Sequence, residues 1–188
     1  MRKFFLAMVL ILIADGARAA TLNVIDGQLH GAFGVDVGGT LYDVEFLDGT
    51  CIALFNGCDA VSDFTFQSSA LAAAASQALL DQVFLDGVLG DFDSIPALSN
   101  GCEGLDECFF YTPYGLIASS VSLLRIAVNS QSGSDRILSG SGGTANDQTN
   151  FALSTYATWT QIPEPSAAYL VALGLTGLSR AKRGRNRS

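Results

Sequence analysis

The sequence predicts an α+β fold in which a small antiparallel sheet packs one amphipathic helix and two local disulfides pin loops. Three observations predict it. Residues 28–37 and 40–47 alternate apolar and polar positions on either side of a Gly-Gly pair. Residues 70–86 are rich in Ala and Leu and contain no Gly or Pro. Four cysteines stand in two close pairs.

The first two strands form a predicted hairpin. Gly38 and Gly39 permit the positive φ angles of a tight turn between residues 28–37 and 40–47. Asp48 and Gly49 then close the second strand. The next segment, residues 51–58, is expected to be a stapled loop or a short strand end.

The helix is predicted over residues 70–86. Ser68 and Ser69 supply an N-cap, and Gly87 stands where a C-terminal cap belongs. The apolar stripe is formed by residues that fall four apart, namely Leu71, Ala75, Leu79 and Val83.

The segment after the helix is predicted to be irregular as far as residue 110, because it contains Gly90, Pro96 and the second cysteine pair. Residues 116–128 are rich in Val, Ile and Leu and predict one long strand or two joined strands, with a helix as the alternative for residues 121–128.

Three further segments lead to the C-terminal region. Residues 136–139 are expected to form a short strand and residues 140–143, Gly-Ser-Gly-Gly, a flexible connection. Residues 151–161 alternate well and predict the last strand. One side of that strand would carry Phe151, Leu153, Thr155, Ala157 and Trp159.

The four cysteines allow three disulfide pairings. Closeness in sequence favours Cys51 with Cys58 and Cys102 with Cys108. A zinc site is the rival interpretation, but the spacings are C-x6-C and C-x5-C, whereas zinc sites commonly use C-x2-C. Export favours disulfides over zinc, because thiols are oxidised outside the cytoplasm.

Both ends of the chain carry export signals. Arg2 and Lys3, an apolar run and a small-x-small site at residues 17–19 predict a signal peptide, residues 1–19. The apolar run is about eleven residues, too short to span a bilayer, which needs roughly 20. Residues 20–162 then form one acidic exported domain of ordinary size.

The charge of the chain is segregated. Residues 20–162 contain Arg125 and Arg136 as their only basic residues other than His30, against sixteen Asp and Glu. Because affinity for phosphate backbones depends on Lys and Arg, nucleic acid is excluded as a partner. The acidity is expected to serve solubility outside the cytoplasm.

Three features stand in order at the C-terminus: Pro163-Glu164-Pro165, the apolar stretch 166–179, and a basic tail. The prolines hold the tripeptide extended, a form that an enzyme cleft can bind. The apolar stretch spans only about 21 Å of a roughly 30 Å hydrocarbon core. A short transmembrane segment with temporary membrane retention is therefore predicted. The tail carries Arg180, Lys182, Arg183, Arg185 and Arg187, which stay on the cytoplasmic side.

This tripartite end, residues 163–188, resembles the PEP-CTERM sorting signal of Gram-negative bacteria. The resemblance implies recognition by an exosortase, a membrane-embedded cysteine transpeptidase, in organisms that make extracellular polysaccharide. Residues 41–46 and 75–81 also resemble uncharacterised members of this set, which brings no activity with it. The resemblance implies transient residence in the inner membrane, and then the cell surface or the extracellular space.

No catalytic constellation is visible in the sequence. His30 is the only histidine, and the sequence contains no G-x-S-x-G motif that would supply a serine nucleophile beside it. Asp43 with Glu45, and Asp91 with Asp93, are the carboxylate pairs that a glycosidase would need. A calcium loop would use Asp91, Asp93 and Asn100, but Ile95 breaks the EF-hand spacing. Four aromatic residues are candidates for a sugar-binding face or for the core: Tyr111, Tyr114, Tyr156 and Trp159.

The sequence therefore predicts a non-enzymatic surface or extracellular-matrix protein that needs no cofactor and no metal. Extracellular polysaccharide is the candidate ligand class. The alternatives are a secreted polysaccharide hydrolase with paired carboxylates and a carbohydrate-binding module.

Overall fold

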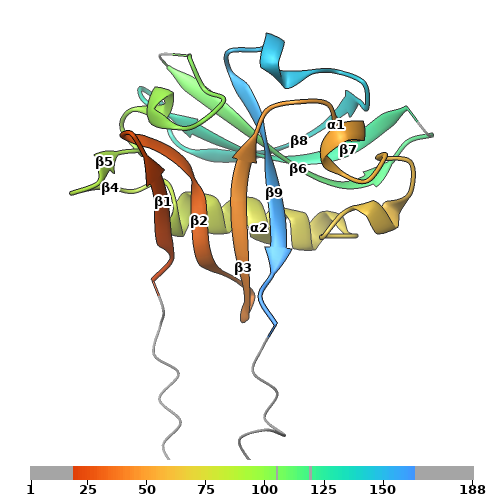
Figure 1. Ribbon diagram of the computed structural model, residues 1–188, viewed down its shortest axis with the longest axis horizontal. Coiled ribbons are helices and arrows are strands. Elements are labelled where there is room, and N and C mark those ends of the chain that lie inside the picture. The colour runs from red at the N-terminus through yellow and green to blue at the C-terminus, as the bar shows by residue number, and fades with distance from the viewer. Residues whose placement is uncertain (1–18, 105, 119, 164–188) are drawn as a thin grey trace, which may run out of the picture.

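The computed structural model describes residues 19–104, 106–118 and 120–163. Within them one helix crosses a face of a seven-stranded sheet (Figure 1). The order across the sheet is β1 (Thr21–Ile25), β2 (Gln28–Val37), β3 (Thr40–Leu47), β9 (Ser154–Gln161), β6 (Glu107–Leu116), β7 (Val121–Ser130) and β8 (Arg136–Gly143). Neighbours are antiparallel except β6 and β9, which are parallel. The predicted α+β class is confirmed.

The first hairpin has the predicted bounds. Val37 pairs with Thr40 across Gly38 and Gly39, whose φ angles are 63° and 91°. Strand β1 was not predicted. It joins β2 through Asp26-Gly27, both at positive φ, and an Asp-Gly pair is itself a hairpin signal. The alternation of Leu22 and Val24 ahead of that pair was therefore the missed indication.

Helix α2 (Ser69–Gln82) begins as predicted, because the Ser68 hydroxyl oxygen accepts the Leu71 N–H at 3.3 Å. Its predicted end at Asp86 is wrong. The N–H groups of Val83 and Phe84 both donate to the Leu79 carbonyl, and both side chains turn into the core. The chain then enters a small hairpin of β4 (Asp86–Gly87) and β5 (Gly90–Asp91).

The buried face of α2 differs from the predicted stripe at one position. Leu71 is 53% exposed, whereas Ala75, Leu79 and Val83 are buried as expected. Small residues complete the buried face, namely Ala72, Ser76 and Ala78. Two bonds fix the C-terminal end of the helix to β2. The Gln82 amide donates to the Asp36 carbonyl at 2.8 Å and accepts the Asp36 N–H at 3.0 Å.

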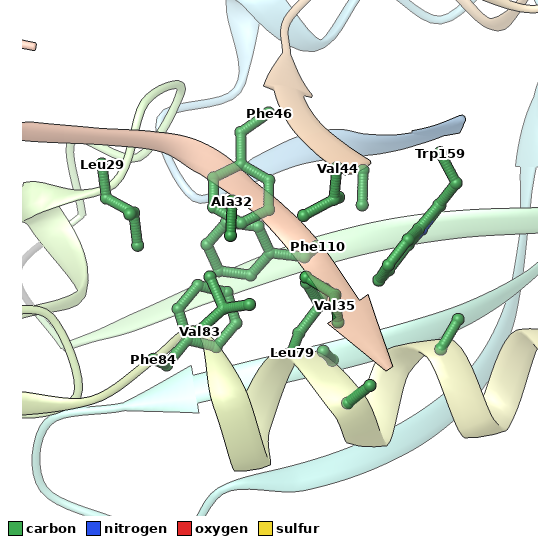
Figure 2. Close-up of a cluster of buried hydrophobic side chains, with 14 of the residues drawn as sticks. Leu29, Ala32, Val35, Val44, Phe46, Leu79, Val83, Phe84, Phe110 and Trp159 are labelled. Atoms are coloured by element: carbon green, nitrogen blue, oxygen red, sulfur yellow. The ribbon is translucent and has the colours of Figure 1, made fainter. Parts of the chain in front are cut away.

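The main core lies between α2 and the sheet (Figure 2). Three phenylalanine rings form its centre. The centroid of Phe110 lies 4.4 Å from that of Phe84 and 4.6 Å from that of Phe46. Trp159 packs edge-on against Phe66 at 5.5 Å. Because Val44, Phe46 and Trp159 alternate with exposed or half-buried neighbours, one face of β3 and β9 supplies this core.

A smaller cluster covers part of the opposite face. It includes Phe55 and Phe64, beside α1 (Cys51–Leu54) and η1 (Val61–Asp63), and Tyr156 from β9. Burial raises the pKa of Tyr156 to about 12. The segment 51–58, expected as a loop or strand end, is thus a short helix followed by a turn.

Two predictions for the second half of the sheet are wrong at their boundaries. The irregular segment ends at β6, which starts at Glu107 and contains Pro113. Proline is tolerated there because β6 pairs with β9 only as far as Tyr111 and a bulge follows Pro113. Residues 121–128 belong to strand β7, so the helical alternative is wrong. Of the run 116–128 only Leu116 belongs to a second strand, β6, so the predicted strand starts at Val121 and not at residue 116.

Residues 140–143 are not a flexible connection but part of β8. Gly140 pairs with Leu124 and Gly142 with Ser122. A Cβ on Gly140 would lie 2.9 Å from the Ile126 Cδ1. The glycines therefore make room for the larger side chains of β7 on this edge strand.

The last strand also begins later than predicted. β9 starts at Ser154, after η3 (Gln148–Asn150), and Phe151 and Leu153 are exposed. Thr155, Ala157 and Trp159 are buried as expected. The alternation therefore predicted the inward face correctly only where β9 pairs with β3 and β6.

Both predicted disulfides are confirmed. The Cα atoms of Cys51 and Cys58 are 5.6 Å apart, and those of Cys102 and Cys108 are 5.9 Å apart. All four residues are buried, the first pair in the smaller cluster and the second in the main core. The bridges therefore do more than pin loops, because they also fill core volume.

Replacing Cys51 and Cys58 together with alanine is expected to lower the free energy of unfolding by about 2.5 kcal/mol from the lost loop constraint. Removal of two buried sulfur atoms adds to this loss. Urea unfolding of the variant and the wild type measures it. A variant as stable as the wild type would show that the bridge does not constrain the unfolded chain.

Candidate functional site

The predicted sorting motif begins directly after the last strand of the sheet, β9. Gln161 of β9 pairs with Tyr42, and the Ile162 N–H donates to the Leu41 carbonyl at 2.9 Å. Pro163 follows directly and is exposed. The folded domain therefore continues up to the residue before the motif. Glu164, Pro165, the segment 166–179 and the basic tail (Arg180, Lys182, Arg183, Arg185, Arg187) lie outside the described residues.

The described N-terminal residues lie at the same end of the sheet. Thr21 pairs with Phe33 of β2, and β2 runs from there toward the Gly38-Gly39 turn. Gln161 is opposite Tyr42, which pairs with Val35 near the same turn. In Figure 1 the chain enters β1 and leaves β9 at the lower edge. Both connections to the predicted terminal signals thus leave from one pole.

Across residues 19–104, 106–118 and 120–163, no helix is both long enough and apolar enough to cross a membrane. The predicted transmembrane segment 166–179 lies outside these ranges.

The first predicted carboxylate pair has a structural contact. Asp43 Oδ1 accepts the Gly34 N–H at 3.0 Å, at the point where β2 and β3 shift register. Gly34 has a φ of 72°, which favours glycine. Glu45, two residues along on the same face of β3, is exposed. Asp43 therefore stabilises an irregularity of the strand pair.

The second predicted pair, Asp91 and Asp93, lies around the β4–β5 hairpin. Asp91 pairs with Asp86 across the hairpin. The Asp86 carboxylate accepts the N–H groups of Asp93 and Ser94, both at 3.0 Å, and the Ser94 hydroxyl. The Ser94 bonds and the Asp93 N–H lower the pKa of Asp86. The Asp86 carboxylate thus holds this loop in place through its hydrogen bonds, a role that the sequence did not predict.

Asp93 contributes instead to a polar hollow of about 370 Å³ with Asp135. Burial raises the pKa of Asp135, and the charge and hydrogen bonding of Asp93 raise it further. The Ser130 N–H donates to Asp135 Oδ1 at 2.9 Å and acts in the opposite direction. Glycosidase carboxyl groups stand about 5–9.5 Å apart to leave room for the sugar or water. Asp91, the predicted partner of Asp93, lies on the β4–β5 hairpin and does not line the hollow.

Beside this hollow, Glu107 and Arg136 form an ion pair with two bonds, at 2.9 and 3.2 Å. The guanidinium lowers the pKa of Glu107. The two side chains are 32% and 41% exposed, so the pair adds little stability. It joins the edge strand β8 to β6.

His30 lines a second hollow of about 430 Å³ with Gln28, Asp26 and Leu98. No serine or cysteine lies among the described residues that line it. A hydrolase would require such a nucleophile within hydrogen-bond reach of the imidazole. The hollow therefore offers no nucleophile–base pair.

The four candidate aromatic residues are divided between the two clusters, with Tyr114 against the main core and Tyr111 against the smaller cluster. Trp159 and Tyr156 are buried in different clusters, and the Trp159 Nε1–H donates to the Thr112 hydroxyl at 3.3 Å. Tyr111 packs edge-on against Tyr156 at 5.8 Å. The prediction that Trp159 belongs to the core is confirmed.

The predicted calcium loop is not assembled. The Asn100 amide donates to the Phe46 carbonyl at 2.7 Å, and Asp93 belongs to the hollow with Asp135. In the part of the chain that the structure describes, no three His, Cys, Asp or Glu side chains are arranged to hold a metal ion together.

No family model, curated protein or solved structure matches this chain.

Proposed function

We propose that this chain is an exported protein that an exosortase-type membrane transpeptidase sorts through its C-terminal signal to the cell surface or extracellular matrix. One observation carries the proposal. Pro163 is exposed directly after the last strand, at the same end of the sheet as the N-terminal residues. A processing enzyme in the membrane would reach the motif at the end of the domain from which both connections leave.

The position of both connections supports this topology. A signal peptide and a C-terminal apolar segment, inserted in one membrane, each end at that membrane's outer side. A domain whose two ends leave from one pole folds between them without stretching (Figure 1). If the two ends lay at opposite poles, a linker would have to run along the domain before the motif. Pro163 instead directly follows Ile162 at the end of the folded domain.

The chemistry of the domain agrees with an extracellular location. Disulfides persist in oxidising compartments, and both bridges are buried in the core. The best-defined carboxylates have structural partners, Asp43 at the Gly34 N–H and Asp86 at the β4–β5 loop. These contacts favour a non-enzymatic domain over a polysaccharide hydrolase. Extracellular polysaccharide is the ligand class that we propose.

Replacing Pro163, Glu164 and Pro165 with alanine is expected to leave a longer species in the membrane fraction. The prolines hold the motif extended for an enzyme cleft, and alanines allow helix to continue through it. Membrane fractionation and gel electrophoresis in a host with the transpeptidase measure the result.

Gln161→Ala is the matched control. Gln161 is exposed and adjacent to the motif, so this variant is expected to be processed and released like the wild type. Identical size and fractionation of the triple-alanine variant and the wild type would contradict the proposal.

A further inference from the structure

The outer edge of β8 carries backbone groups that bond to no other strand in the described part of the chain. β8 is the last strand in the order of the sheet, and residues 136–143 pair with β7 on one side. Across residues 19–104, 106–118 and 120–163, the backbone hydrogen bonds made outside the sheet do not involve residues 137–142. A free edge of this kind is a template on which another strand can pair.

β8 lacks the features that protect most edge strands, which are short length, bulges, lysine and proline. The other edge strand, β1, has five residues and a register shift between Asn23 and Val24. β8 has eight residues in unbroken register with β7, and its one charged residue, Arg136, stands at its first position. The outer edge of β8 is therefore straight and open.

The alternation of hydrogen bonds decides which residues of β8 face outward. The Thr144 N–H donates to the Ser120 carbonyl at 2.9 Å, in the same register as the β7–β8 pairs. Because every second residue of an antiparallel strand bonds to its neighbour, the even-numbered residues bond to β7 and the odd-numbered ones face outward. The Gly143 carbonyl already accepts the Asn146 N–H at 3.0 Å. The positions that stay free are Ile137, Ser139 and Ser141.

We propose that two copies of this chain form a dimer in which their β8 strands pair antiparallel about a two-fold axis at Ser139. Ser139 then bonds to Ser139 of the second copy, and Ile137 bonds to Ser141 of the second copy on either side of the axis. A contact of one surface with itself closes after two copies, so it gives a dimer and not a fibre.

This register is the one that uses all the free positions of β8. In an antiparallel pair, two residues bond to each other only if both face outward, so odd-numbered residues must pair with odd-numbered ones. An axis at residue 140 would need the Gly143 carbonyl, which already has a partner. An axis at residue 138 would place Ser141 opposite Asp135, which lies outside the strand. An axis at Ser139 avoids both.

The side chains of β8 fit the same register. Leu138 is 37% exposed, and it falls opposite Gly140 of the second copy. Within one copy Leu138 pairs with Ile126 and Gly140 pairs with Leu124, so these positions share one face of the sheet. The exposed leucine is therefore covered in the dimer, beside a residue that has no side chain to obstruct it.

The charge distribution favours this edge for contact between two acidic domains. β8 contains no acid, and both arginines of residues 20–162 lie at it, since Arg136 belongs to β8 and Arg125 donates to the Ser139 hydroxyl. Arg125 also bonds to Ser69, which holds its guanidinium on its own copy. The two Arg136 residues stand about 20 Å apart along the paired strands, beyond the range of unscreened repulsion. The copies thus meet through the least acidic part of their surfaces.

Sedimentation equilibrium of the mature, disulfide-bonded chain tests the dimer. A contact made mainly by one strand of each copy is small, so the expected Kd is about 10–100 µM. Leu138→Lys is expected to weaken the dimer at least about tenfold, because lysine on an edge strand opposes pairing. Thr21→Lys is the matched control. Thr21 is exposed on the other edge strand, β1, and this variant is expected to dimerise like the wild type.

Ser139→Pro tests the register. Because the Ser139 N–H faces outward, proline removes a bond of the dimer and none to β7. This variant is expected to be monomeric and to keep the urea midpoint of the wild-type monomer. If it fails to fold, the Ser139 N–H bonds to β7 and the register is wrong.

Three results of the sedimentation experiment would contradict the proposal. One is a wild-type chain that stays monomeric up to about 1 mM, which would leave the edge to a strand of another protein. The others are a Leu138→Lys variant that dimerises as tightly as the wild type and a folded Ser139→Pro variant that does so.

Discussion

Replacing Phe110 with alanine is expected to lower the free energy of unfolding by about 3–5 kcal/mol. Phe110 is 0% exposed and its ring contacts both Phe84 and Phe46 (Figure 2). Phe110 comes from β6, Phe84 from the segment directly after α2, and Phe46 from β3. The variant therefore leaves a cavity at the place where the helix meets the middle of the sheet.

Phe33→Ala is the control for Phe110→Ala. Phe33 has the same side chain but is 48% exposed on β2, so its loss is expected to cost within about 0.5 kcal/mol. Urea unfolding followed by tryptophan fluorescence measures both, since Trp159 is buried in the same core. Equal losses for the two variants would contradict the packing of α2 on this face.

Gly31→Ala is expected to cost about 2–5 kcal/mol, from strain and overlap together. Gly31 has a φ of 139°, and it pairs with Asn23 on one side and Glu45 on the other. A Cβ there would collide with the Val44 carbonyl oxygen and lie 2.9 Å from the Glu45 Cα. Relief would require β2 and β3 to separate.

Gly27→Ala separates strain from overlap. Gly27 also has a positive φ, 82°, but a Cβ there meets nothing within 4 Å. It is expected to cost about 1–2 kcal/mol from backbone strain alone. The difference in urea midpoint between the two variants measures the close approach of β2 to β3. If Gly27→Ala costs as much as Gly31→Ala, this register of the strands is wrong.

Local patterns in the sequence predicted local structure well. The Gly38-Gly39 hairpin, the Ser68 cap and both disulfides depend on residues that are close in sequence. Their geometry follows from backbone preferences and short loops. The signal at Asp26-Gly27 was of the same kind, so β1 could have been predicted as well.

Long-range pairing could not be read in this way. The parallel contact of β6 with β9 joins Phe110 to Thr155, and no short segment encodes it. The helix end at Gln82 depends on tertiary burial of Val83 and Phe84. The glycines of β8 led to the prediction of a flexible linker. The reason for their small size is apparent only when Leu124 and Ile126 of the neighbouring strand are seen beside them.

The candidate sites divide in the same way: arrangements within one strand could be predicted from the sequence, and contacts between distant segments could not. Asp43 and Glu45 share a strand face, as alternation predicts, but the bond from the Gly34 N–H to Asp43 depends on a bulge. Asp135 lines the same hollow as Asp93 only because of the fold. Sixteen acids in residues 20–162 offer many pairs, and sequence alone does not select among them.

The most direct test of the proposed sorting is the intact mass of the protein recovered from the surface or medium of cells that have the transpeptidase. The expected mature chain starts at Ala20, ends at or near Glu164 without the segment 166–188, and gains two hydrogen atoms per disulfide on reduction. A recovered chain that still carries residues 166–188 would contradict the account.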